Sequence, residues 1–221
     1  SGFVIACELG RYQGKMVVYN PQNQRVTPII HFETNIDDGQ LVEKIFQNSK
    51  KLIRENQIDK EKIAAFGLTM PGLVDETAGI NYTIKDKRYR NVKERLENKF
   101  KMLVYVNNDA RMQAYGEFIF GKARGHENSI IVNWDWGIGM GMILNGKLFN
   151  GSTGFAGEFS HIKVEEEGGL CICGKRGCLE TVASANVLLS YAKKEIREGT
   201  VSQLTEKFKG QTESLQLADI I

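Results

Sequence analysis

The sequence has few prolines, few histidines and no long hydrophobic run. Only 3 of its 221 residues are proline and 3 are histidine, whereas 23 are glycine. Few prolines and many glycines indicate tight turns between regular elements rather than a disordered linker. No apolar stretch approaches the roughly 20 residues of a membrane-spanning helix, and no secretory signal pattern is present. We therefore expect a globular protein that works in the cytoplasm without contacting a membrane.

An excess of charge of one sign is also missing. The chain has 29 lysines and arginines against 27 aspartates and glutamates, a net charge of +2. This balance argues against a nucleic-acid-binding surface on this segment. Hydrophobic residues make up 42% and charged residues 25% of the chain, which is ordinary for a folded soluble domain. Its length suffices for one large or two small domains.

Hydrophobic periodicity in the first half predicts a sheet with helices. Apolar segments at 3–7, 15–19 and 25–32 favour three consecutive strands in an antiparallel meander. Apolar residues at helical spacing predict helices, and shorter apolar runs predict further strands. The helices are expected at 39–56, 91–100 and 110–120, and the strands at 63–70 and 103–106.

A similar pattern begins again after Asn107. Strands are expected at 129–134 and 137–144, and Asn145-Gly146 predicts a hairpin turn into 147–149. We therefore expect an N-terminal α/β lobe over 1–107 and a larger C-terminal α/β lobe over 108–221. The polar tail at 201–221 lacks a clear closing element, and 217–221 resembles the start of a helix. We interpret the chain as a fragment that is truncated within its C-terminal lobe.

Three of the four cysteines lie within eight residues, which points to a metal site. In a chain without an export signal, such clustering favours a metal over disulfides. Zn²⁺ prefers four nitrogen or sulfur ligands in a tetrahedron, and four protein ligands make a closed, structural site. The expected ligands are His161, Cys171, Cys173 and Cys178, with Gly174 and Gly177 permitting the tight turns between them. The alternatives are three reduced thiols without a metal, or a disulfide between two of them. Cys7 lies in an apolar strand and is expected in the core.

Several polar residues lie near this motif or at a strand end. Asn108 and Asp109 follow a strand and precede a helix, a position where α/β folds place ligands. Asp109 could equally be a helix N-cap. Glu158 lies three residues before His161, and Glu180 two after the last cysteine. Carboxylates beside a closed metal site can orient an imidazole or accept hydrogen bonds from a polyol, although an isolated glutamate is usually a solvated charge.

These motifs together resemble the ROK family of bacterial sugar kinases and sugar-responsive repressors. The family signature is similar to Gly157-Glu158-Phe-Ser-His161 followed by Cys171-Ile-Cys173-Gly-Lys-Arg-Gly177-Cys178-Leu-Glu180-Thr. Met70-Pro71-Gly72 resembles the family's sugar loop, and Asn107-Asn108-Asp109-Ala110 its Asn-Asp-Ala motif. The resemblance implies an actin-like, hexokinase-like α/β fold of two lobes, with a ribonuclease H-like motif in each lobe and a cleft between them.

The resemblance also implies how the site works. A monosaccharide or sugar phosphate would be held by Gly72, Asn108, Asp109, Glu158, His161 and Glu180. His161 would use one ring nitrogen for the zinc and the other for the sugar. In a kinase, Asp109 would be the catalytic base that takes the proton from the attacking hydroxyl. Family members are commonly dimers or tetramers, so a homo-oligomer is expected.

Two segments depart from the kinase pattern. Family kinases have Asp-x-Gly-Gly-Thr after the first strand, where this chain has Glu8-Leu-Gly-Arg11-Tyr12. Their second phosphate loop reads Gly-Thr-Gly-Ile-Gly, where this chain has Asp135-Trp136-Gly-Ile-Gly. Glycines let the backbone approach phosphates, whereas bulky side chains and a carboxylate oppose that approach. The glycines of 137–141 are therefore interpreted as close packing of a strand.

These departures favour a sensor over an enzyme. We expect the sugar-effector-binding portion of a ROK-type transcriptional repressor. It would act on operator DNA through a winged helix-turn-helix domain that is not in this chain. The alternative is a glucokinase-like sugar kinase that uses ATP and Mg²⁺. A third possibility is a stand-alone sugar-binding or scaffolding protein.

Overall fold

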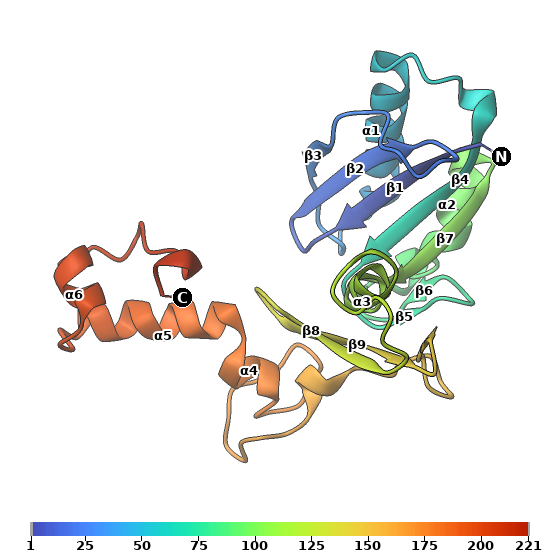
Figure 1. Ribbon diagram of the computed structural model, residues 1–221. Helices are drawn as coiled ribbons and strands as arrows, with labels where there is room; N and C mark the ends of the chain where they lie inside the picture. Colours follow the sequence, from blue (N-terminus) through green and yellow to red (C-terminus); the bar gives the residue numbers. More distant parts are fainter. Residues whose placement is uncertain (1, 221) are drawn as a thin grey trace.

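The computed structural model describes residues 2–220 and places a five-stranded sheet in the first half of the chain (Figure 1). Its strands run in the order β3-β2-β1-β4-β7. They are β1 (Phe3–Leu9), β2 (Gln13–Tyr19), β3 (Ile30–Glu33), β4 (Ile63–Met70) and β7 (Leu103–Asn108). β1, β2 and β3 form the expected antiparallel meander, and β4 and β7 continue the sheet in parallel.

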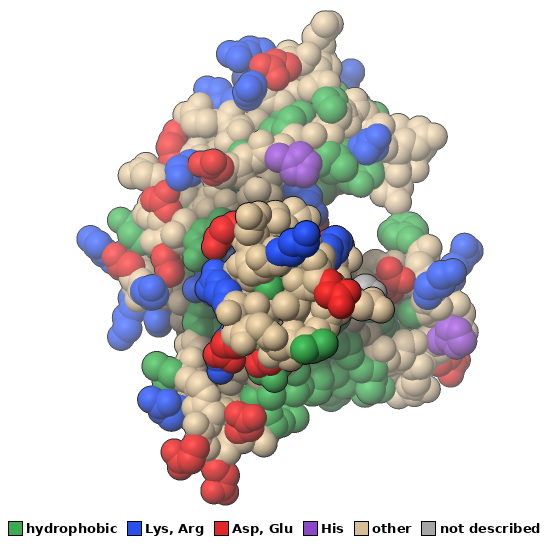
Figure 2. Space-filling view, turned by 90° about the vertical axis from the view of Figure 1, so that its left-hand side faces the viewer, with side chains coloured by type: hydrophobic (Ala, Val, Ile, Leu, Met, Phe, Trp, Pro, Cys, Tyr) green, Lys and Arg blue, Asp and Glu red, His purple; other side chains and the backbone are tan. Residues whose placement is uncertain are grey.

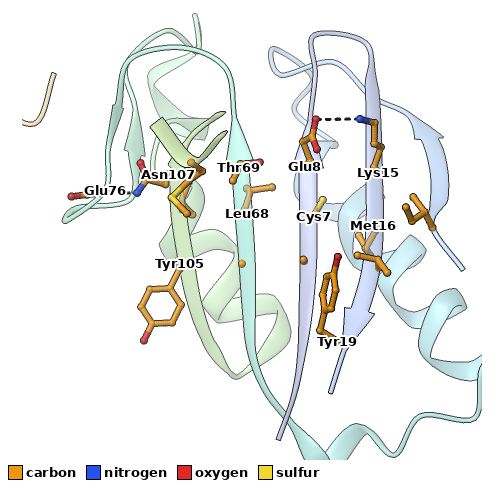
Figure 3. A pocket seen from close by; sticks show the side chains of 16 residues that line it. Cys7, Glu8, Lys15, Met16, Tyr19, Leu68, Thr69, Glu76, Tyr105 and Asn107 are labelled. Atoms are coloured by element: carbon orange, nitrogen blue, oxygen red, sulfur yellow. Dashed lines mark hydrogen bonds and ion pairs between the residues drawn. The ribbon is translucent and has the colours of Figure 1, made fainter. Parts of the chain in front are cut away.

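One face of this sheet carries the main hydrophobic core. Two helices supply its other half, α1 (Leu41–Glu55) and α2 (Val92–Phe100). Leu41, Ile45 and Leu96 are fully buried against sheet residues such as Phe66. The opposite face is open and contains a hollow of about 680 Å³, with Tyr105 at its rim 61% exposed (Figure 3).

The prediction for the third strand was wrong over most of its length. The strand begins at Ile30 and not at residue 25, and Arg25 makes only an isolated bridge to Tyr19. Pro28 has no amide hydrogen for a ladder, and the Thr27 hydroxyl accepts the hydrogen bond from the Val18 amide instead.

The second sheet has three antiparallel strands in the order β10-β9-β8 and repeats the meander of the first. They are β8 (Ser129–Trp134), β9 (Ile138–Leu144) and β10 (Lys147–Leu148). The predicted hairpin turn is confirmed, because Asn145 and Gly146 have φ values of 53° and 70°. β8 forms one edge of this sheet, and its Ile130, Val132 and Trp134 side chains are 66%, 51% and 42% exposed.

Helix α3 (Asp109–Phe120) links the two sheets, since it begins directly after β7 and packs on β8 and β9 (Figure 1). The helix approaches β9 closely at two glycines. A Cβ on Gly139 would lie 2.5 Å from the Ala110 Cβ, and one on Gly141 would lie 2.3 Å from the Ala114 Cβ. This contact agrees with the interpretation of these glycines as packing residues.

The C-terminal part folds into short elements around α5. They are η3 (Phe159–His161), α4 (Leu179–Ala183), α5 (Ala185–Arg197), α6 (Gln203–Phe208) and η4 (Leu217–Asp219). The expectation that the tail lacks a closing element was wrong for its described part, because Leu204, Phe208 and Leu215 pack against Ala192 and Ile196 of α5. Helix α6 supplies Leu204 and Phe208, but it is only six residues long, so its apolar spacing is too short to stand out in the sequence. The predicted helix at 217–221 is a single 3₁₀ turn in η4, and residue 221 lies outside the described part.

The remaining elements are small. They are the hairpin β5 (Val74–Asp75) and β6 (Ile80–Asn81), with the 3₁₀ turns η1 (Lys60–Lys62) and η2 (Lys87–Tyr89). Charged side chains of both signs are interspersed on the face shown in Figure 2, and hydrophobic side chains gather in its lower part. Within residues 2–220, no helix combines the length and apolar character needed to cross a membrane.

Candidate functional site

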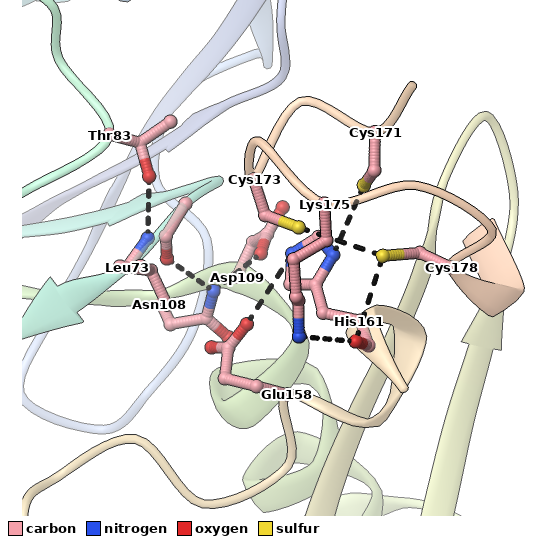
Figure 4. A network of polar contacts seen from close by, with 11 residues as sticks. Leu73, Thr83, Asn108, Asp109, Glu158, His161, Cys171, Cys173, Lys175 and Cys178 are labelled. Carbon is pink, nitrogen blue, oxygen red and sulfur yellow. Dashed lines mark hydrogen bonds and ion pairs between the residues drawn. The ribbon is translucent and has the colours of Figure 1, made fainter. Parts of the chain in front are cut away.

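The predicted metal ligands come together in the structure. The ligand atoms of His161, Cys171, Cys173 and Cys178 all lie within 4.8 Å of one another (Figure 4). Cys173 Sγ lies 3.6 Å from Cys178 Sγ, and Cys171 Sγ lies 3.5 Å from His161 Nδ1. Zinc bonds of about 2.3 Å to sulfur and about 2.0–2.1 Å to nitrogen give tetrahedral edges of about 3.8 and 3.6 Å. The donor set and its spacing therefore fit Zn²⁺.

The turn that carries these cysteines depends on Gly177. Its φ is 72°, and a Cβ there would lie 1.7 Å from the Glu165 carbonyl oxygen. The carbonyl of Gly177 in turn accepts the Val164 amide at 2.8 Å, which closes the loop around the ligands. Burial raises the pKa of the Cys171 thiol to about 12. A bound cation would oppose this shift, because it stabilises the thiolate.

His161 connects this cluster to the polar residues. Its Nδ1 faces Cys171, while its Nε2 lies 3.9 Å from Glu158 Oε2. One ring nitrogen thus points to the metal ligands and the other to the carboxylate side, as Figure 4 shows. Cys178 Sγ lies 3.6 Å from the His161 carbonyl, and Lys175 donates to the same oxygen at 2.7 Å. The C-terminal end of the short helix η3 is therefore held against the cysteine loop.

Asn108 and Asp109 occupy the N-terminus of α3. The Asn108 side chain is the N-cap, because its Oδ1 accepts the Arg111 amide at 3.0 Å. Its Nδ2 donates to Asp109 Oδ1 and to the Gly72 carbonyl, both at 3.1 Å. Asp109 is the first residue of the helix, so the N-cap alternative for Asp109 was wrong. Its carboxylate also accepts the Ala110 amide at 2.8 Å.

Burial shapes the electrostatics of the two central carboxylates. It raises the pKa of Asp109, and the negative charge of Glu8 acts in the same direction. Burial also raises the pKa of Glu158, where Asp109 and Glu180 add to the effect and Arg111 opposes it. Asp109, Glu158 and Glu180 thus form an acidic cluster in which the charges influence one another. A charge-poor ligand with many hydroxyl groups suits such acceptors.

The remaining predicted residues, Gly72 and Glu180, lie in two other elements. Gly72 is in the turn between β4 and β5 with a φ of 105°. Glu180 lies in α4, and its Oε2 would be 3.4 Å from a Cβ on Gly137. The sequence did not single out Arg111, which is only 2% exposed and lies among these groups. An arginine on the buried face of a predicted helix, two residues after Asp109, was the available signal.

Each of the two turns that depart from the kinase pattern uses one of its backbone amides for an internal hydrogen bond. The Gly10 amide donates to the Gln13 carbonyl at 2.7 Å, and the Asp135 amide donates to the Gly137 carbonyl at 3.0 Å. Tyr12 and Trp136 are 59% and 58% exposed at these turns. Phosphate loops instead leave several amides free to converge on one anion.

Comparison with known proteins decides the family. A family model described as the ROK family matches residues 6–220. This chain belongs to the ROK family. The expected actin-like, hexokinase-like fold is also confirmed by solved structures. A Streptomyces griseus ROK glucokinase, solved with glucose and AMPPNP, superposes with a TM-score of 0.83 at 27% identity over 99% of this chain and 70% of that chain. A ROK transcriptional regulator, a homolog of the Escherichia coli MLC protein, superposes with a TM-score of 0.80 at 24% identity. That match covers 99% of this chain and 54% of the regulator's chain.

Curated ROK relatives include both regulators and kinases. The xylose repressor of Bacillus subtilis is 38% identical over 58% of this chain and 33% of its own length. A Halalkalibacterium halodurans glucokinase is 36% identical over 77% and 53%. The regulator NagC of E. coli is 30% identical over 90% and 50%. The matches thus cover between 33% and 53% of these relatives.

Proposed function

We propose that this ROK chain is the sugar-sensing portion of a transcriptional regulator. It binds a monosaccharide or sugar phosphate and acts on operator DNA through a domain outside this chain. The sugar contacts in this proposal are Gly72, Asn108, Asp109, Glu158, His161 and Glu180. Zn²⁺ on His161 and the three cysteines fixes η3, and thereby Glu158. A homo-oligomer is part of the proposal.

The observation that carries this proposal is the conformation of the two turns, at 8–12 and 135–139, that replace the phosphate loops of the kinases. A polyphosphate needs free backbone amides and no opposing charge. Here the Gly10 and Asp135 amides are already bonded within their own turns. Arg11 lies over the ring of Tyr12, with its Cζ 5.8 Å from the ring centroid, and Trp136 projects into solvent. The Asp135 carboxylate adds repulsion.

The kinase remains the second candidate because Asp109 is half-buried and has a raised pKa, which suits a catalytic base. The glucokinase relative, 36% identical over 77% of this chain, supports it too. In that case ATP and Mg²⁺ would bind beside Gly137, and Asp109 would take the proton of the attacking hydroxyl. The sensor and the kinase therefore share the sugar pocket and differ in nucleotide binding.

Calorimetry with ATP-Mg and with D-glucose, D-xylose and N-acetyl-D-glucosamine tests this proposal. We expect one sugar to bind and ATP-Mg not to bind. The matched variant restores the kinase pattern with Arg11→Gly, Tyr12→Thr, Asp135→Gly and Trp136→Thr, and it should gain ATP-Mg affinity. Turnover by the complete parent polypeptide at ordinary kinase rates, about 1–100 s⁻¹, would overturn the sensor in favour of the kinase.

A further inference from the structure

Arg111 joins two segments that flank the candidate site. Its side chain is only 2% exposed. One end of the guanidinium donates to the Val74 carbonyl at 2.5 Å, and its other nitrogen donates to the Gly154 carbonyl. Val74 lies two residues after Gly72, and Gly154 lies four residues before Glu158. The arginine thus connects the hairpin that follows the Gly72 turn to the segment that leads into Glu158.

Glu76 makes a second connection between the same regions. Its Oε2 accepts the Asn107 Nδ2 at 2.5 Å (Figure 3). Its Oε1 accepts the Asn150 Nδ2. Asn107 lies at the end of β7, directly before the Asn108 N-cap. Asn150 belongs to the segment after β10. The β5–β6 hairpin, the end of β7 and the segment from 150 to 158 are therefore joined by two charged side chains.

Burying the Arg111 side chain in this way costs folding free energy, which suggests that the arginine has a role other than stability. Both acceptors of the Arg111 guanidinium are backbone carbonyls, and burial lowers its pKa, with Glu76, Glu158 and Asp75 acting against that shift. A buried cation without a directly bonded carboxylate is unfavourable compared with an apolar side chain of similar size. The segment from 150 to 158 has little regular structure of its own. One of its amides, that of Ala156, donates to the Asn150 carbonyl at 3.1 Å.

We propose that Arg111 and Glu76 are positioning residues that latch the 150–158 segment onto the β5–β6 hairpin and α3. The latch builds the pocket in the ligand-free protein, so Gly72 and Glu158 face Asp109 before a sugar arrives. Pre-ordering of this kind raises affinity because less conformational freedom is lost on binding. The effect on sugar binding rests on the proposed function, whereas the ordering of the segment does not.

Amide hydrogen exchange of ligand-free protein, followed by NMR, tests the latch directly. Arg111→Met keeps the length and removes both hydrogen bonds. The Ala156 amide should exchange about tenfold faster or more, the size expected for loss of a hydrogen bond to a charged group. Amides bonded between strands of the five-stranded sheet, and zinc content, should not change. Arg124→Met, on an exposed arginine after α3, is the matched control and should leave Ala156 unaffected.

A charge swap at Glu76 gives an independent arm. Asn150→Asp places two carboxylates against each other and should also accelerate Ala156 exchange. Adding Glu76→Gln restores a donor facing the new carboxylate at position 150, and keeps an acceptor for Asn107, so the double variant should return toward the wild-type rate. A merely destabilised protein would not be rescued by a second change. Unchanged exchange in Arg111→Met, or no rescue in the swap, refutes the latch.

The sugar arm separates the latch from the proposed function. Calorimetry uses whichever of D-glucose, D-xylose and N-acetyl-D-glucosamine binds the wild type. Arg111→Met should weaken that binding about tenfold or more. Asn150→Asp should weaken it as well, and adding Glu76→Gln should restore the affinity that Asn150→Asp loses. Faster exchange with unchanged affinity refutes the positioning role. A wild type that binds none of the three sugars counts against the proposed function, while the exchange rates still decide for or against the latch.

Discussion

Replacing Gly141 by alanine should destabilise the protein because α3 lies against this strand position. The added Cβ would lie 2.3 Å from the Ala114 Cβ, 3.1 Å from the Ala110 carbonyl oxygen and 3.2 Å from the Arg111 Cα. Two of these three neighbours are backbone atoms, which cannot rotate away, so α3 must shift. Overpacking of a core contact costs about 1–3 kcal/mol. For a chain of this size, that lowers Tm by roughly 2–12 °C.

The control for this prediction is Gly116→Ala in the same helix. A Cβ there meets nothing within 4 Å, and alanine is favoured over glycine inside a helix by about 1 kcal/mol. Gly116→Ala should therefore raise Tm by about 2–4 °C, whereas Gly141→Ala lowers it. Thermal unfolding at matched zinc content measures both. An equally stable Gly141→Ala would refute the packing role and reopen a nucleotide-binding role for these glycines.

Three further predictions concern the metal and the carboxylates. Metal analysis should find about one zinc per chain; Cys178→Ser should lose zinc and thermal stability, whereas Cys7→Ala should keep the zinc. Asp109→Asn should weaken sugar binding by roughly ten- to a hundredfold, since hydrogen bonds to charged groups contribute about 1.5–3 kcal/mol; calorimetry showing unchanged affinity would contradict the pocket. The same Asp109→Asn should stabilise the ligand-free protein, because burial raises the pKa of Asp109. Ionisation of this carboxylate therefore lowers the stability of the folded protein as pH rises from the ordinary aspartate pKa to the raised one. The Tm of Asp109→Asn should accordingly exceed that of the wild type by more at high pH than at low pH.

Much of the fold was predictable because its elements follow simple periodicities. The strand at 63–70 and that at 129–134 have the predicted bounds, and the helix predicted at 39–56 spans Leu41–Glu55. Alternation and helical spacing reflect burial on one face, which the sequence records directly. The third strand failed because Pro28 interrupts it. Helix α5 (Ala185–Arg197) was not predicted, although the helix is amphipathic and buries one face.

The metal cluster was predictable because its ligands are close in the sequence and chemically distinctive. The contacts of Arg111 and Glu76 were not, because they join residues 31 to 74 positions apart. Each partner is a backbone carbonyl or an asparagine amide, and neither type marks a site by itself. Nothing in the sequence links Arg111 and Glu76 to these partners, and only folding brings them into contact.

The exposed edge of β8 has a consequence for any preparation of this chain. An edge strand presents unpaired amides and carbonyls, and an apolar, uncharged edge invites another strand to add to it. Ile130, Val132 and Trp134 give β8 such a character over its whole length. Concentrated solutions of the 221-residue chain should therefore self-associate through sheet extension. Val132→Lys would suppress that association, because a lysine on the edge strand opposes the addition of another strand.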